Sequence, residues 1–143
     1  MTVAAILSEK GREVVTTSAM ASIAGAVDAL AKHKIGALVV VDETDHIIGI
    51  ISERDIVRAI AEKGEKVLTT PLSTVMTRTV VTCSETETVN DVMTRMTRGR
   101  FRHLPVVENG HLSGIISIGD VVRARIEQVE REAEDMRAYI AAV

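Results

Sequence analysis

The chain has 143 residues, of which 46% are hydrophobic and 26% are charged, and its net charge is −3. This apolar fraction predicts an ordered chain, built as one ordinary domain or as two small modules that share a core. The slightly acidic balance and the presence of only two aromatic residues disfavour a nucleic-acid-binding surface, and the single cysteine, Cys83, excludes an internal disulfide or a zinc cluster.

The N-terminal segment contains no long apolar run and reaches the charged pair Glu9 and Lys10 early. We therefore expect neither a signal peptide nor a membrane anchor, and we expect a soluble, cytoplasmic protein without a membrane partner.

The first predicted elements are a short helical lead-in over Val3–Leu7 and a strand over Val14–Thr16. A helix follows from Ile23, because apolar residues recur there at i, i+3, i+4 and i+7. Two β-branched runs, Leu38–Val41 and Ile47–Ser52, then predict a pair of strands. They are followed by a second helix, which is expected to begin near residue 55.

The middle of the chain, residues 62–73, is charged and then polar and carries Pro71, as is typical of a linker. A short helical lead-in is expected over Leu72–Met76, in the position that Val3–Leu7 has in the first half.

The second half predicts the same order of elements. A strand over Val80–Thr82 leads to a helix whose start has a capping pair, Thr88 and Asp91. Asn109-Gly110 is a strong turn signal between the next two strands. These two strands cover Leu104–Val107 and Leu112–Ser117, and a final helix runs from about Asp120 to about Ala141.

The two halves are an internal repeat. At an offset of 66 residues, and of 65 after a one-residue deletion in a turn, identical or similar residues stay in step. The matching segments are VVTTS (14–18) with VVTCS (80–84), LVVV (38–41) with LPVV (104–107), and GIISERDIVRA (49–59) with GIISIGDVVRA (114–124).

The predicted fold class is α+β, with two β-α-β-β-α repeats packed as a pseudo-two-fold module because each repeat is small for a separate domain. The predicted segments are repeat 1 (1–62), a linker (63–73), repeat 2 (74–126) and a C-terminal helical extension (127–143). That extension continues an apolar stripe, which either covers its own domain or pairs with another subunit. The stripe consists of Ile126, Val129, Ala133, Met136 and Ile140.

The motif Gly-Ile-Ile-Ser-x-x-Asp occurs twice, each time where a strand enters a helix. Ser52 with Asp55, and Ser117 with Asp120, fit a capping box that needs no ligand. The same arrangement also suits a nucleotide, because free helix amides attract phosphate and a carboxylate accepts hydrogen bonds from both ribose hydroxyls. Both interpretations stay open for a single copy, and the duplication favours a ligand.

Basic residues gather between the second repeat's first helix and its next strand, where no acid lies between Arg95 and His103. Arg95 and Arg98 are consistent with a solvated helix end, whereas Arg102, His103 and Arg54 predict a phosphate receptor. No nucleophile elbow, metal-protease, P-loop or dinucleotide motif is present, so we expect no enzyme. Cys83 lies beside an apolar strand and is expected to act as a small hydrophobic side chain without a reactive role.

The duplicated unit, with its GIISERD, GIISIGD and RHLPVV segments, resembles the tandem cystathionine β-synthase (CBS) domain, or Bateman module, over about Val3 to Ile126. The resemblance implies a stand-alone CBS pair that forms a homodimer and binds adenosine ligands in two clefts between the repeats. Such ligands are AMP, ADP, ATP, S-adenosylmethionine or a dinucleotide.

The resemblance also implies roles for individual residues. Asp55 and Asp120 would bind ribose beside Ser52 and Ser117, with Thr16 and Thr82 near ribose and phosphate. The segments 35–37 and 101–103 would contact the adenine edge. The full implied binding set is Thr16, Lys34, Ile35, Gly36, Ala37, Ser52, Arg54, Asp55, Thr82, Arg100, Phe101, Arg102, His103, Pro105, Ser117 and Asp120.

The two clefts are expected to differ, because Gly36 and Ala37 lack the cationic pair Arg102-His103, and Gly119 replaces Arg54. The resulting hypothesis is a non-catalytic sensor of an adenine nucleotide, AMP-like or else ADP, ATP or NAD(H), with an unidentified target protein. Two alternatives remain: a fragment or subunit associated with an inosine monophosphate dehydrogenase-like enzyme, and a structural partner protein with empty clefts.

Overall fold

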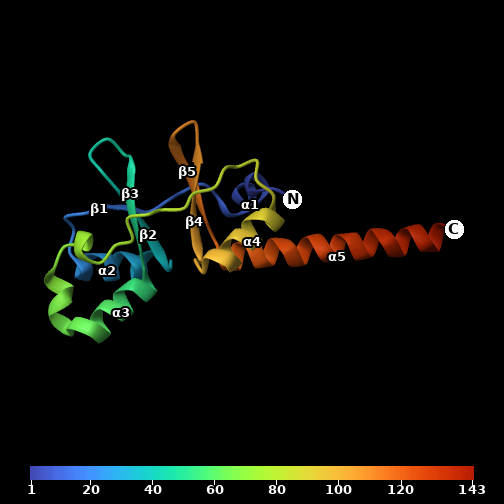
Figure 1. The fold of residues 1–143 in the computed structure, drawn as a ribbon. Coiled ribbons are helices and arrows are strands. Elements are labelled where there is room, and N and C mark those ends of the chain that lie inside the picture. The colour runs from blue at the N-terminus through green and yellow to red at the C-terminus, as the bar shows by residue number, and fades with distance from the viewer. The chain divides into compact units, whose positions relative to one another are not determined.

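The computed structural model describes residues 1–143 and divides into two compact units. One unit is continuous and consists of Val14–Val81. The other combines Met1–Glu13 with Thr82–Val143, so the N-terminal segment belongs to the unit that contains the second repeat. Figure 1 labels the elements of both units.

The continuous unit is an α+β structure with a three-stranded sheet in the order β1-β2-β3. Strand β1 is parallel to β2, and β2 is antiparallel to β3. Its elements are β1 (Thr16–Ser18), α2 (Ile23–His33), β2 (Ala37–Val41), β3 (Ile47–Ser52), α3 (Glu53–Lys63) and the 3₁₀ turns η1 (Glu65–Thr69) and η2 (Leu72–Thr74). The first strand thus lies two residues further along the chain than the sequence predicts.

Helix α2 forms where the sequence predicts it, and its ends have clear causes. The Ser22 hydroxyl accepts a hydrogen bond from the amide of Gly25, and Lys34 ends the helix in the left-handed conformation at φ 54°. The apolar positions of α2 are buried together with β2, β3 and α3, which forms one core.

Residues 63–73, for which the sequence suggests a linker, pack onto this core. Val67 and Leu72 are buried, and the Leu72 amide donates to the carbonyl of Ala21. Next to this segment, Met76 lies so close to Gly49 that a Cβ there would come within 2.7 Å of the sulfur. The segment therefore contributes to the continuous unit's core.

The second unit contains two α-helices and a hairpin from the second repeat, together with one helix from the N-terminal end of the chain. Its elements are α1 (Val3–Lys10), α4 (Val89–Gly99), β4 (His103–Glu108), β5 (His111–Ser117) and α5 (Ile118–Ala142). Asn109 and Gly110 both have positive φ, 51° and 78°, as the predicted two-residue turn requires. Both capped helices begin two residues earlier than predicted, because the capping serine is the last residue of the strand.

The strand predicted over Val80–Thr82 does not form. Only Cys83 makes a bridge, parallel to Val106, with bonds to Pro105 and Val107. The chain then turns immediately, since the Ser84 amide donates to the carboxylate of Glu87. The sheet of this unit consequently has two strands, β4 and β5.

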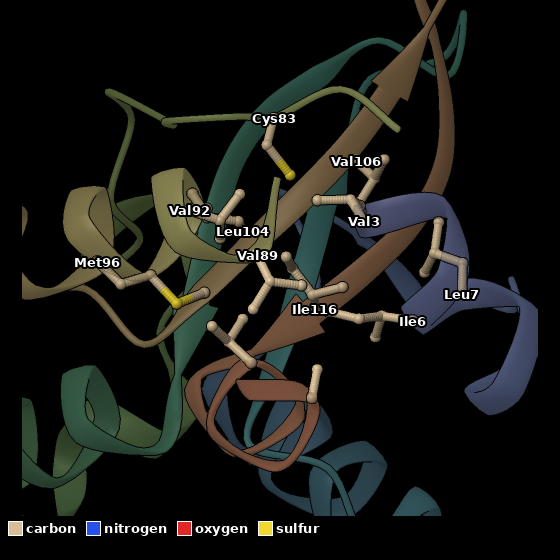
Figure 2. Close-up of a cluster of buried hydrophobic side chains, with 12 residues drawn as sticks. Val3, Ile6, Leu7, Cys83, Val89, Val92, Met96, Leu104, Val106 and Ile116 are labelled. Atoms are coloured by element: carbon tan, nitrogen blue, oxygen red, sulfur yellow. The ribbon is translucent and has the colours of Figure 1, made fainter. Parts of the chain in front are cut away.

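Helix α1 closes the core of the second unit. Figure 2 shows Val3, Ile6 and Leu7 in the same buried cluster as Leu104 and Ile116. Backbone bonds fix the helix there, since the Val3 amide donates to the Glu87 carbonyl and the Val89 amide to the Met1 carbonyl. Segments from opposite ends of the sequence thus share one hydrophobic core.

No helix of the chain is both long enough and apolar enough to span a membrane.

The contact between Leu7 and Gly114 leads to a stability prediction. A Cβ at Gly114 would lie 2.7 and 2.8 Å from the two methyl carbons of buried Leu7. Gly114→Ala should therefore lower the free energy of unfolding by about 1–3 kcal/mol, the usual cost of overpacking, as measured by urea denaturation.

The matched control is Gly119→Ala, because that position is exposed on the first turn of α5 and its added methyl meets only Ser117 Oγ at 3.6 Å. This control should be neutral or stabilise by about 0.4–1 kcal/mol. Equal effects of the two substitutions would contradict the proposed packing of α1 on β5.

Candidate functional site

In the continuous unit, the candidate site lies at the junction of β3 and α3. The amide and hydroxyl of Ser52 donate to Asp55 Oδ2 at 2.9 and 3.0 Å, and the Asp55 amide donates to Ser52 Oγ at 3.3 Å. These bonds form a complete capping box. They involve Oδ2 alone, so Oδ1 of the half-buried Asp55 retains its acceptor capacity.

The sheet brings other predicted residues to the same end. Ala37 pairs with Ser52 between β2 and β3, and the Gly36 carbonyl accepts a hydrogen bond of 3.0 Å from the Glu53 amide. Thr16 begins β1 at this end of the sheet, where β1 runs parallel to β2. The structure therefore gathers segment 36–37, Ser52 and Asp55 around the start of α3, while Thr16 lies on the other side of β2, opposite Val39.

Lys34 and Ile35 contribute to a neighbouring feature. They line a groove of about 560 Å³ between α2 and α3, whose floor and walls are mainly aliphatic and which neither Ser52 nor Asp55 lines. Arg54, the second residue of α3, is exposed and makes no ion pair. Lys34 and Ile35 thus belong to the groove and not to the capping box, and Arg54 lies in the first turn of α3.

The second repeat has the same capping box but a different partner for its aspartate. The Ser117 amide donates to Asp120 Oδ2 at 2.8 Å, and the Asp120 amide donates to Ser117 Oγ at 3.1 Å. Lys10 of α1 adds a salt bridge of 2.7 Å to the same oxygen and donates to the Ile115 carbonyl at 2.9 Å. A lysine from the N-terminal segment therefore holds the second aspartate.

These contacts change the acidity of Asp120. Burial alone would raise its pKa, but the hydrogen bond from Lys10 and the donors of Ser117 outweigh burial, so the pKa lies below its ordinary value. The side chain of Asp120 is only 11% exposed. It is consequently a half-buried carboxylate that stays ionised because an ammonium group faces it.

The backbone around Arg102 repeats the arrangement at Gly36. The Arg102 carbonyl accepts a hydrogen bond of 2.8 Å from the Ile118 amide, and His103 pairs with Ser117 across the hairpin. The Arg102 side chain is exposed. In this unit the structure therefore gathers Arg102, His103, Ser117 and Asp120 around the start of α5.

Three other residues that were predicted to bind ligand, Arg100, Phe101 and Pro105, contribute to the local structure of this unit. Arg100 ends α4 in the left-handed conformation, and the ring of Phe101 lies over Gly99, where a Cβ would clash with it. Pro105 is buried and its carbonyl accepts from the amide of Cys83, as part of the bridge described above.

Arg95 and Thr82 form a further set of contacts. Arg95 makes an ion pair of 2.5 Å with Glu87 and donates to the Thr82 carbonyl at 2.6 Å. The sequence suggests that Arg95 is a solvated helix end or part of a basic patch. The structure instead gives it an ion pair and a backbone hydrogen bond within its own unit.

Two residues of these sites were missed by the sequence analysis, Lys10 and Glu87. Lys10 is separated from Asp120 by 110 positions, and no local pattern links them. Glu87 had a weak signal, since it lies one residue before the capping Thr88. The chain contains no group of three or more His, Cys, Asp or Glu residues that could hold a metal ion.

Comparison with known proteins identifies the fold. The profile of the CBS domain matches residues 4–62 and again 72–127. The chain belongs to the CBS-domain family. Two CBS domains cover it, which confirms the expected α+β CBS pair with a long C-terminal helix.

Several CBS relatives are similar over most of the chain. A crystal structure of a CBS-domain containing protein from Agrobacterium tumefaciens is 50% identical, covers 87% of this chain and 92% of its own, and superposes with a TM-score of 0.85. The CBS domain pair of protein MJ0100, solved in complex with 5′-methylthioadenosine and S-adenosyl-L-methionine, is 30% identical over 90% of this chain and 98% of its own, with a TM-score of 0.80.

A curated relative is the mitochondrial CBS domain-containing protein CBSX3 of Arabidopsis thaliana. It is 38% identical over 119 residues, which are 80% of this chain and 58% of that protein. This chain therefore spans little more than half of the Arabidopsis relative.

The Lys10–Asp120 pair predicts a pH-dependent stability difference. Because the pKa of Asp120 is lowered in the folded protein, the pair stabilises above the unfolded pKa near 4, and this contribution is lost as pH falls through the folded pKa. Lys10→Met should reduce the free energy of unfolding by about 1 kcal/mol at pH 7, a value that allows for the partly exposed lysine.

The difference between the wild type and Lys10→Met should shrink as the pH falls below the unfolded pKa near 4, because the unfolded chain takes up the proton first, and it should disappear below the lowered pKa of folded Asp120. Denaturant unfolding over a pH series measures it. Lys66→Met, which removes an exposed lysine without an ion pair, is the control and should show no such pH dependence. A constant difference across the series would rule out the ion pair as its cause.

Proposed function

We propose that this CBS pair is a non-catalytic regulatory module that binds an adenosine ligand, AMP-like or else ADP, ATP, NAD(H) or S-adenosylmethionine, in a homodimer. The observation that carries the proposal is the Asp55 carboxylate, which is fixed by its capping box through one oxygen and keeps the other available. The ligand-bound state would differ in its affinity for a target protein, which is how a binding module transmits a signal.

The chemistry of the junction suits the parts of an adenosine ligand. The two ribose hydroxyls are donors, and a fixed carboxylate accepts both of them without ordering a flexible side chain. The start of α3 favours a phosphate or carboxylate group, because its dipole is positive there and the free cation of Arg54 lies in its first turn. Backbone groups of segment 35–37 would contact the adenine edge.

The related structure supports the choice of ligand class. Protein MJ0100 holds 5′-methylthioadenosine and S-adenosyl-L-methionine, which both contain adenosine and differ beyond the ribose. The part that both ligands share is the part that a ribose-binding aspartate and an adenine-contacting backbone would recognise. The substituent beyond the ribose, which distinguishes AMP from S-adenosylmethionine, is thus the part that experiment must identify.

The two repeats are proposed to bind with different affinities. A ribose at Asp120 has to compete with Lys10, which already donates to the carboxylate at 2.7 Å. Asp55 has no such cation. We therefore assign the tighter site to the first repeat, with the Lys10 ammonium available to a phosphate at the second.

A regulatory role fits the reactivity of the chain better than catalysis does. Its one thiol is buried, and burial together with nearby Glu87 raises the pKa of Cys83 to about 12. Such a thiol is not a nucleophile at neutral pH.

The proposal is tested by binding measurements on the full chain with substitutions at the two aspartates. Titration calorimetry with AMP, ADP, ATP, NAD, S-adenosylmethionine and GTP should give binding for adenine compounds and none for GTP. Asp55→Ala should weaken the tighter site roughly ten- to hundred-fold, equal to about 1.5–3 kcal/mol for hydrogen bonds to a charged group. Asp120→Ala should leave that site unchanged.

Asp91→Ala is the matched control. Asp91 occupies the same third position of a capped helix, α4, and its amide donates to Thr88, yet no ligand is assigned to it. If Asp91→Ala weakened binding as much as Asp55→Ala, the effect would not be specific to the assigned site and the ribose role would be wrong. If no adenine compound binds and acid extracts show no nucleotide absorbance, the structural-partner alternative replaces this proposal.

A further inference from the structure

The C-terminal helix α5 carries a continuous apolar stripe that its own unit leaves in solvent. The helix buries only Val121 and Ala124. The stripe residues lie on another face, and their exposed fractions are Val122 43%, Ile126 52%, Val129 45%, Met136 60%, Ile140 67% and Val143 93%. Figure 1 shows α5 extending far beyond the other two helices of its unit.

The exposed stripe settles a question that the sequence left open. If α5 only covered its own domain, these side chains would be buried, and they are not. With the half-buried Ala133 included, the stripe positions alternate in steps of four and three residues over three heptads. This spacing is the pattern of a coiled-coil seam and not of a helix that lies on a globular core.

The apolar surface continues to the start of the helix. A shallow apolar groove at the base of α5 is lined by Ile118, Gly119, Val122 and Ile126, with Arg123 and Glu127 at its rim. The stripe and this groove form one surface, and a protein rarely leaves such a surface open to water unless a partner covers it.

The charges beside the seam indicate which partner fits. In the heptad that places Ile126 and Ile140 at a, the residues Arg125 and Glu132 occupy g positions, and Glu130 and Arg137 occupy e positions. In a parallel, in-register pair, each g residue faces the e residue five positions later on the other helix. Arg125 then faces Glu130 of the partner subunit, and Glu132 faces Arg137 of the partner subunit.

An antiparallel pair uses these charges less well. The register that places Ile140 beside Val122 of the partner subunit sets Glu130 opposite Glu130 of the partner subunit, which is repulsive. If the antiparallel helices are shifted by one heptad toward their C-terminal ends, Glu130 pairs with Arg137 of the partner subunit. Val122 and Arg125 then lie outside the overlap. In the parallel pair, Arg123 also occupies an e position and faces the uncharged Ile118 of the partner subunit. The parallel arrangement alone gives the other four flanking charges an opposite neighbour and covers the whole stripe.

We propose that α5 pairs with α5 of a second copy of this chain as a parallel, in-register, two-stranded coiled coil over residues 122–143. The flanking charges pair between two copies, and the small Ala133 at the central a position lets two helices approach closely. This pairing does not depend on the proposed ligand, because none of the stripe residues belongs to the candidate binding sites.

Disulfide trapping in the full-length protein tests both the partner and the direction. Met136→Cys places a thiol at a d position, where two parallel in-register helices bring identical residues together. Mild oxidation should convert most of the Met136→Cys protein into a covalent dimer. Arg131→Cys, on the opposite face of α5, is the matched control and should form no covalent dimer under the same oxidation. The native Cys83 is buried and adds no background.

Charge-reversal substitutions test the ion pairs between Arg125 and Glu130 of the partner subunit. Glu130→Arg should weaken the dimer at least tenfold in sedimentation equilibrium, because it faces Arg125 of the partner subunit, and Arg125→Glu combined with Glu130→Arg should restore it. Light scattering of the unmodified protein should give twice the 15.4 kDa chain mass.

A monomer, a trimer, or a Met136→Cys dimer that forms no homotypic disulfide would each overturn the proposal. So would a charge exchange that does not restore the dimer. Loss of nucleotide binding at Asp55 would leave these outcomes unchanged, so failure of the ligand assignment is distinguishable from failure of the helix pairing.

Discussion

The structure depends on how a β-strand passes into a helix without an intervening loop. Ser52 is the last residue of β3 and the N-cap of α3, and Ser117 has both positions for β5 and α5. The first helical amides would be unsatisfied at such a junction, which a half-buried site does not tolerate. Each capping box satisfies the amides of its serine and its aspartate, and the Gly36 and Arg102 carbonyls accept from the first helical amide. Each junction thereby ties a helix to the start of the neighbouring strand.

The repeats keep this junction and differ around it. The first repeat has a three-stranded sheet, whereas the second has a two-stranded sheet and a single bridge at Cys83. Asp55 faces no cation, while Asp120 is held by Lys10 of α1. Duplication has therefore preserved the element that organises the backbone, and the neighbouring side chains have become free to differ. Two sites with one geometry and two electrostatic environments are the result.

Most of the architecture could be predicted because its signals are local. The apolar spacing from Ile23 and the Asn109-Gly110 turn describe contacts within a few residues, and the structure confirms them. The strand expected over 80–82 was wrong because β propensity alone does not supply a pairing partner. The position of Lys10 was not predictable, since the repeat pattern assigns the N-terminal segment to the repeat that follows it. Which residues meet across the sites was therefore only partly accessible, although the sequence identified the serines and aspartates at their centre.

The membership of α1 in the second unit has a consequence for biosynthesis. The unit Val14–Val81 is continuous, so it can fold as soon as it leaves the ribosome. Val3 and Leu7 are made first, yet the strands and helices that bury them are made last. During translation these apolar side chains have no native partner until about the last third of the chain has emerged. The apolar face of α1 thus stays exposed to water during synthesis until the second repeat is complete.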